Sequence, residues 1–270
     1  MKRMIGVNSN CYHGYSIEEA LEGIHKAGFR YVELTATKGW TEHVFPTQSF
    51  SYLVGLKKKM QELSIIPFAL SGHCNLMDQE RMKDFAENIE LARFFGCKYI
   101  VSSVGEAHLE DKETAGNDVL AENIKSVIPQ LEEANMTLVL EIHGEHCNGI
   151  ILKEIVDLID SEHVRINYDT ANAIFYGGVK PEEDMQNCKD EIAYMHLKEK
   201  RGEQQEWDFP ALGKGTVNFP QIFENLAKNQ NECPFSIEIE FTKDGPKDLE
   251  EVNQAVADSC QYLKEQGFEI

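Results

Sequence analysis

Two spacings of apolar residues alternate along the chain. Short apolar runs that end at polar or glycine residues predict buried strands. Between these runs, apolar residues recur three and four positions apart, which predicts amphipathic helices. The predicted strands are Met1–Asn8, Tyr31–Thr35, Ile65–Leu70, Tyr99–Val104, Thr137–Glu145, Arg165–Asp169, Ala193–Lys198 and Phe235–Glu240.

The predicted helices carry start and stop signals. A capping box from Ser16 to Glu19 opens the first helix, and Gly28 ends it. Gly96 and Asn135 are residue types that end helices in the left-handed conformation. The predicted helices are Ile17–Ala27, Phe50–Leu63, Met82–Ala92, Val119–Leu131, Ile151–Ile159, a short one after Pro181, Phe219–Ala227 and Leu249–Gln266.

This alternation predicts a fold. Eight strands, each followed by a helix, are typical of a (β/α)8 TIM barrel. No linker or low-complexity tract interrupts the pattern, so we expect a single domain over residues 1–270. An open doubly wound sheet is the alternative, but it normally has a glycine-rich first turn, and residues 8–11 read Asn-Ser-Asn-Cys.

Polar groups gather at the ends of the last four strands. Side chains two apart on a strand share a face, so each of these strands delivers polar groups to one side. Parity cannot separate Glu238 from Glu240, or His196 from Lys198, because each pair shares a face. Since the carboxyl ends of barrel strands carry the sites of this fold, we expect a common site there.

Carboxylates and one imidazole in this arrangement predict a divalent-metal site. The four candidate ligands are Glu141, Asp169, His196 and Glu238. Such a set favours Mn²⁺, with Mg²⁺, Co²⁺ or Zn²⁺ as alternatives. Without a cation, the like charges of so many carboxylates would destabilise one another. A metal that chelates a hydroxyl and its neighbouring carbonyl acidifies the carbon between them, so proton abstraction through an enediolate is the expected chemistry.

Composition narrows the classes of partner. The net charge is −20, which disfavours nucleic acid and anionic membranes. The seven cysteines include no C-x-x-C pair, which indicates reduced thiols. The first apolar run is too short for a signal peptide, and no segment reaches the length of a membrane span. We therefore expect a cytoplasmic protein that acts on a small molecule.

Five motifs resemble the xylose isomerase-like TIM barrels. The motifs are L-E-I-H (140–143), Y-D-T-A-N (168–172), M-H-L-K-E-K (195–200), L-G-K-G-T-V-N-F (212–219) and S-I-E-I-E (236–240). That superfamily holds the tagatose/psicose 3-epimerases, hydroxypyruvate isomerase, inosose dehydratase and endonuclease IV. The resemblance implies a metal-dependent sugar isomerase or epimerase, with an inosose-type dehydratase as the alternative. Relatives are often homodimers or homotetramers.

Carried over by position, the resemblance selects Glu238 rather than Glu240 as the fourth metal ligand. It also makes Glu141 and Glu238 the proton-transferring pair. Two positions depart from the 3-epimerases. Asn172 stands where they have a histidine, and Cys147 stands where they have a substrate-binding glutamate, with Glu145 close by.

Further residues are candidates for substrate binding. Basic residues at and just after the end of the seventh strand, Lys198, Lys200 and Arg201, suit a phosphate or carboxylate, and so do the glycines of 213–215, although these also suit a tight turn. Aromatic residues at 40, 175, 176 and 207 suit either sugar stacking or packing. The expected substrate-binding residues are His73, His108, His143, Asn172 and Lys198.

Two other functions fit the same barrel. An endonuclease IV-like enzyme needs further histidines for its zinc cluster, but Asn172 replaces one of them and the sequence 206–210 lacks the D-x-H pair. The acidic charge also disfavours DNA. A sugar-binding barrel without turnover is the other reading, but it has no need of two carboxylates placed for proton transfer.

Overall fold

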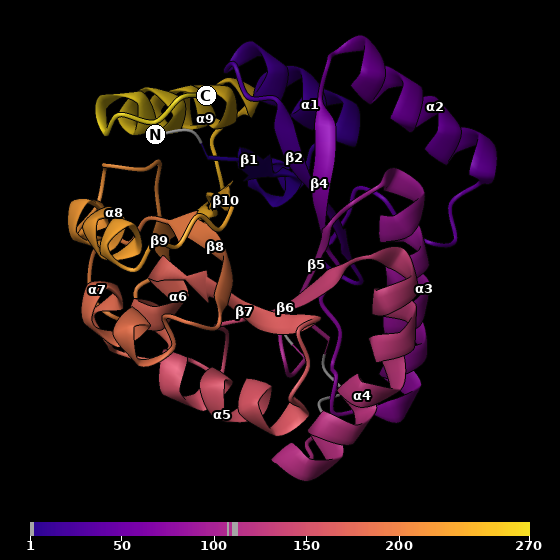
Figure 1. Cartoon of the computed structure of the whole chain (residues 1–270). Coiled ribbons are helices and arrows are strands. Elements are labelled where there is room, and N and C mark those ends of the chain that lie inside the picture. The colour runs from indigo at the N-terminus through magenta and orange to yellow at the C-terminus, as the bar shows by residue number, and fades with distance from the viewer. Residues whose placement is uncertain (1–2, 107, 110–112) are drawn as a thin grey trace.

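The predicted strands form a closed parallel sheet in the computed structural model, which describes residues 3–106, 108–109 and 113–270 (Figure 1). The sheet order is β1-β10-β8-β7-β6-β5-β4-β2, and pairing of β1 with β2 closes the ring. The barrel strands are β1 (Ile5–Asn8), β2 (Tyr31–Thr37), β4 (Ile66–Ser71), β5 (Tyr99–Ser102), β6 (Thr137–Glu141), β7 (Val164–Asp169), β8 (Ile192–Lys198) and β10 (Phe235–Glu238). The predicted TIM barrel is thereby confirmed.

Helices surround the ring and follow the strands in chain order (Figure 1). The capping box at Ser16 and the left-handed stops at Gly96 and Asn135 are all present. Asn218 caps the helix that starts with Phe219 and Pro220. The helices are α1 (Ile17–Lys26), α2 (Phe50–Glu62), α3 (Gln79–Phe95), α4 (Asn117–Ala134), α5 (Gly149–Ile159), α6 (Thr170–Phe175), α7 (Pro181–Asp184), α8 (Phe219–Lys228) and α9 (Leu249–Glu265).

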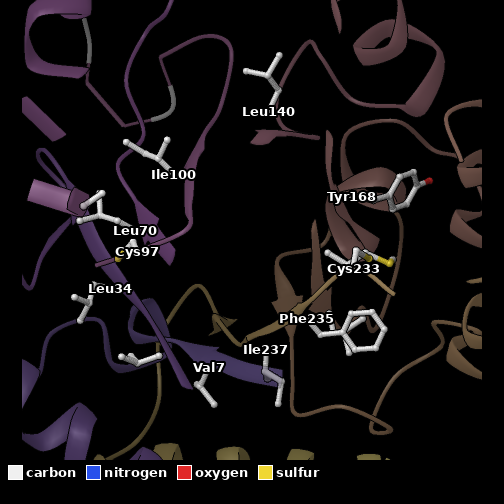
Figure 2. Packing of buried hydrophobic residues seen from close by; sticks show 14 of the residues in the cluster. Val7, Leu34, Leu70, Cys97, Ile100, Leu140, Tyr168, Cys233, Phe235 and Ile237 are labelled. Carbon is white, nitrogen blue, oxygen red and sulfur yellow. The ribbon is translucent and has the colours of Figure 1, made fainter. Parts of the chain in front are cut away.

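The apolar core has two parts, because strand side chains alternate between the two faces of the barrel wall. Outward-facing residues pack against the helices, and Figure 2 shows several of them in a ring, including Val7, Leu34 and Leu140. A separate, smaller cluster comprises Phe68, Ala69, Val101, Val139 and Tyr194. These residues come from β4, β5, β6 and β8 and are separate from the larger cluster that packs against the helices.

Several predicted strand ends were wrong. The first strand begins at Ile5, with Met1 and Lys2 outside the described residues, and the fourth ends at Ser102 rather than Val104. The fifth ends at Glu141, because His143 and His146 pair across a tight turn. The eighth ends at Glu238, and the chain then turns into β11 (Phe241–Thr242), which pairs antiparallel with β9 (Asp208–Phe209).

The short helix predicted after Pro181 is present as α7, but a further helix that was not predicted, α6, directly follows β7. Asp169 is the N-cap of α6, and its Oδ1 accepts hydrogen bonds from the backbone N–H groups of Ala171 and Asn172 at 2.9 and 2.7 Å. No helix was predicted over residues 170–175, because six residues are too few to show a helical repeat. A short strand, β3 (Thr41–Glu42), was likewise not predicted.

Two expectations about the chain as a whole can be compared with the structure. The cysteines are all free, as the sequence predicts. Over residues 3–106, 108–109 and 113–270, no helix combines the length and apolarity that crossing a bilayer requires.

Candidate active site

Four side chains from neighbouring strands meet at the carboxyl end of the barrel. They are Glu141 of β6, Asp169 of β7, His196 of β8 and Glu238 of β10. One ligand atom from each lies within 4.8 Å of the others, and all four residues are buried. The strands β6, β7, β8 and β10 are consecutive around the ring, so the expected ligand set converges as predicted.

Two of the atoms that face one another here, in His196 and Asp169, lack a hydrogen-bond partner among the described residues. His196 Nδ1 lies 2.5 Å from Glu141 Oε1, 3.6 Å from Asp169 Oδ2 and 3.5 Å from Glu238 Oε2. Nevertheless, Nδ1 and Asp169 Oδ2 form no hydrogen bond to any described residue. Buried polar atoms without hydrogen bonds are rare in folded proteins. Lone pairs directed at a common point fit a divalent cation with oxygen and nitrogen ligands.

Hydrogen bonds from neighbouring groups orient two of the four side chains, Asp169 and His196. Since Asp169 Oδ1 caps α6, only Oδ2 is left to face the other ligands. His196 is held on its far side, where Nε2 lies 3.1 Å from both carboxylate oxygens of Glu33. In a neutral His196 ring this contact would place the proton on Nε2, so that the lone pair of Nδ1 faces the other predicted ligands.

Glu33 is a buried carboxylate that the sequence analysis missed. It is fully inaccessible, and its Oε2 accepts a 2.8 Å hydrogen bond from the Tyr194 hydroxyl. Its Oε1 accepts a weaker one from Asn8 Nδ2 at 3.3 Å. The available signal was a charged residue within an otherwise apolar strand, Y-V-E-L-T-A-T.

Amide groups from the end of β1 and from the turn that follows it hold the fourth predicted ligand, Glu238. Asn8 Nδ2 and Asn10 Nδ2 each lie 3.2 Å from Glu238 Oε1. Asn10 also donates to Glu240 Oε1 at 3.2 Å. Lys198 Nζ lies 3.3 Å from Glu238 Oε2 and 2.6 Å from Glu240 Oε2. Glu240 therefore lies beside the predicted ligand set rather than in it.

Burial and crowding shift the pKa values of the ligands. Burial, reinforced by Glu238 and Asp169, raises the pKa of Glu141 to about 8, although His196 opposes that rise. For His196, burial alone lowers the pKa, but Glu33, Glu141 and Glu238 outweigh it and raise the pKa well above its usual range. In the absence of a cation, Glu141 and His196 therefore retain protons that a bound metal would displace.

A cavity of about 130 Å³ opens above these residues. The structure brings all the expected substrate-binding residues to its wall, while their roles remain predictions. They are His73, His108, His143, Asn172 and Lys198. Glu141, Glu238 and Glu240 also line it, whereas Glu145 is exposed and is not among the described lining residues.

The histidines of this wall are oriented by their neighbours. His73 Nδ1 accepts a 2.9 Å hydrogen bond from the Ser103 backbone N–H, so the ring is neutral and presents Nε2–H to the cavity. That Nε2 lies 3.7 Å from Glu141 Oε2. The Tyr176 hydroxyl lies 3.4 Å from His143 Nε2. The amide of Asn172 donates to the backbone carbonyl of Ile142 at 3.0 Å.

Aromatic rings stack at one side of the mouth. Trp40 lies between His13 and His108, with centroid separations of 4.1 and 4.8 Å and nearly parallel planes. Its indole N–H donates to Asn10 Oδ1 at 3.0 Å, which fixes the ring. Trp40, Tyr176 and Trp207 line the cavity, whereas Phe175 packs against Trp207 and Phe209. Of the four aromatic candidates, three are thus placed to contact a substrate.

Comparison with known proteins agrees with the fold and with the position of the site. The xylose isomerase-like TIM barrels match residues 21–266 of this chain. The chain belongs to this family. An inosose dehydratase from Geobacillus kaustophilus is 26% identical over 182 residues, which cover 55% of this chain and 58% of that protein.

Solved structures of xylose isomerase-like barrels superpose on nearly the whole chain. An L-ribulose 3-epimerase has 17% identity and a TM-score of 0.75, covering 99% of this chain and 94% of its own. A family member from Mycobacterium smegmatis in complex with magnesium has 14% identity and a TM-score of 0.78, covering 97% and 96%. At these identities the likeness establishes the shared fold alone.

Proposed function

We propose that this chain is a divalent-metal-dependent sugar isomerase or epimerase that works by proton abstraction next to a carbonyl. The observation that carries the proposal is the convergence of Glu141, Asp169, His196 and Glu238 below a polar cavity. Two of these residues, Glu141 and Glu238, also line the cavity and so can reach a bound substrate. The epimerase among the structural neighbours is consistent with this chemistry.

The four residues would hold one divalent ion, with Mn²⁺ as the first candidate and Mg²⁺ consistent with a neighbouring structure. When bound, the ion would supply Lewis-acid polarisation of a carbonyl and its adjacent hydroxyl. Proton transfer and substrate orientation would be carried out by side chains of the protein itself.

Glu141 and Glu238 stand on separate strands, with β8 and β7 between them in the sheet order. One carboxylate removes the proton from the carbon next to the carbonyl, which gives an enediolate, and a carboxyl group returns a proton to complete the isomerisation. The raised pKa of Glu141, about 8 through burial, suits a group that accepts and returns a proton near neutral pH.

The cavity wall would orient the substrate. The Nε2–H of His73 faces the cavity beside Glu141, where it can donate to a substrate oxygen. His108 covers one face of Trp40 and His13 covers the other, so this aromatic stack forms one side of the cavity mouth. Several such contacts would hold the substrate in a reactive orientation relative to the catalytic carboxylates and restrict its motion in the cavity.

A dehydratase is the second candidate. Inosose dehydratase is the curated relative described above, and removal of water from a carbon next to a ketone begins with the same proton abstraction. After that step, a β-hydroxyl leaves instead of a proton returning. The mass of the product separates the two reactions, because only the dehydratase loses water.

The test is NMR of ketoses, aldoses and inososes incubated with the protein and Mn²⁺ in D₂O. Deuterium at C3 would identify an epimerase, deuterium at C1 or C2 an aldose–ketose isomerase, and water loss a dehydratase. Glu141→Gln and Glu238→Gln should each lower exchange by roughly 10²–10⁴-fold while the circular dichroism spectrum is unchanged. Full exchange in both variants would contradict the mechanism.

A further inference from the structure

We infer that the cavity selects an uncharged polyhydroxy carbonyl compound and that Glu240 is the residue that excludes phosphorylated and carboxylated sugars. The inference rests on the proposed function and adds the substrate class to it. Three features of the described residues carry it: the charge of the cavity, the pairing of its lysine, and the filling of the loop where a phosphate would bind.

The cavity carries an excess of negative charge. Carboxylates from Glu141, Glu238 and Glu240 line it, and those of Asp169 and Glu33 are buried beside them. Even a bound divalent cation and the lysine would leave two negative charges uncompensated if these five carboxylates were ionised. An anionic substrate would enter against that charge.

Lys198 is the one lysine or arginine among the described residues of the cavity wall. Its ammonium is already engaged by two carboxylates, at 2.6 Å in Glu240 and 3.3 Å in Glu238. It also lies 4.7 Å from the centroid of the Phe209 ring. Because its charge is compensated by the protein, Lys198 offers no free cation to a phosphate or carboxylate.

The glycine-containing loop after β8 is filled by the chain's own carboxylate. Barrels of this type frequently bind phosphate in that region through backbone N–H groups. Here the buried Glu199 accepts from the N–H groups of Gly213, Val217 and Lys200 at 3.0, 2.9 and 3.0 Å. A carboxylate therefore occupies the donors that a substrate phosphate would need.

The two other basic residues of this segment are turned to local partners. Lys200 Nζ donates to the backbone carbonyls of Arg201 and Glu203, and Arg201 pairs with Asp208 at 2.7 Å. Neither residue lines the cavity in the described part of the chain. The suggestion from the sequence that these two residues hold an anionic group is therefore not supported.

These contacts give Glu240 a defined role in specificity. It is positioned by Asn10 and holds Lys198, but the predicted ligand set does not include it. Replacing its carboxylate by an amide of the same shape removes one negative charge and the shorter of the two ion pairs of Lys198, which leaves the lysine paired with Glu238 alone. Both changes favour an anion, so the preference for neutral over anionic substrates should fall on the order of tenfold or more in Glu240→Gln.

The experiment compares neutral ketohexoses and inososes with their phosphate esters and with sugar acids. The measured quantities are H/D exchange in D₂O with Mn²⁺ and binding, followed by the fluorescence of the tryptophans. Inorganic phosphate serves as a competing probe. Glu162→Gln is the matched control, since Glu162 is exposed, precedes β7 at the opposite end of the barrel, and loses the same charge.

Wild type and Glu162→Gln should bind or turn over only the neutral sugars and should not bind inorganic phosphate. Glu240→Gln should gain affinity for the phosphate esters, the sugar acids and inorganic phosphate. Exchange or binding of a phosphorylated sugar by wild type that matches its neutral counterpart would overturn the inference and leave the proposed function standing. Absence of exchange with every compound would contradict the proposed function. The inference about substrate charge would then be tested by the binding data alone. Failure of every neutral compound to bind would also overturn the inference.

Discussion

Replacement of Glu33 by glutamine tests the architecture of the predicted metal centre. Glu33 receives the Nε2–H of His196 at 3.1 Å and the hydroxyl of Tyr194 at 2.8 Å in a site closed to solvent. Glutamine keeps the shape but removes the charge that orients His196. Loss of such a partner typically weakens metal binding by about 10- to 100-fold. We expect this reduction in Mn²⁺ affinity, which corresponds to about 1.4–2.8 kcal/mol.

Calorimetric titration of the chelator-treated protein with Mn²⁺ measures this effect, and Glu162→Gln is again the control for a neutralised exposed carboxylate. Tyr194→Phe removes one donor to Glu33 without removing the charge, so its Mn²⁺ affinity should change less than that of Glu33→Gln. Wild-type affinity in a folded Glu33→Gln protein would refute the assignment of Glu33 as the positioning residue of His196.

Three further predictions concern pH and the metal. Burial raises the pKa of Glu141 to about 8, and neighbouring carboxylates raise the pKa of His196 well above its usual range. Metal binding must displace both protons, so Mn²⁺ affinity should rise with pH through about 8, and a flat calorimetric profile would count against this. Between the ordinary carboxyl value of 4.5 and about 8, the folded metal-free protein holds a proton that the unfolded chain has lost. The contribution of Glu141 to the free energy of unfolding should therefore fall as pH rises through this window, as measured by urea unfolding with chelator. At a free Mn²⁺ concentration of 100 times Kd, the folded state should gain about 2.7 kcal/mol, and an unchanged melting temperature would argue against a metal site.

The order of strands and the convergence of the four predicted ligands could be anticipated from sequence because both depend on local pattern. Apolar runs identify barrel strands, and the period of two assigns a face to Glu141, Asp169, His196 and Glu238. Parallel strands in chain order then bring their carboxyl ends together. Strand ends were less predictable, since residues such as Glu240 continue the alternation after the hydrogen-bonded ladder has stopped.

Other parts of the site depend on contacts between residues far apart in sequence. Asn10 contacts Glu238 only when closure of the barrel brings β1 beside β10. Glu33 contacts His196 only when the closed barrel places both side chains in its interior. Nothing in the local sequence of β2 indicates a partner more than 150 residues away, as the Glu33–His196 separation of 163 positions shows.

What the amino-acid sequence determined by itself was the barrel and the residue types at its carboxyl end, because periodicity and strand parity are properties of neighbouring positions. Only the tertiary structure decided how the charges are compensated. Lys198 appeared free to bind an anion until Glu240 was seen beside it, and the glycine loop appeared open until Glu199 was seen within it. Charge compensation depends on distances between side chains, and these are set when the barrel closes.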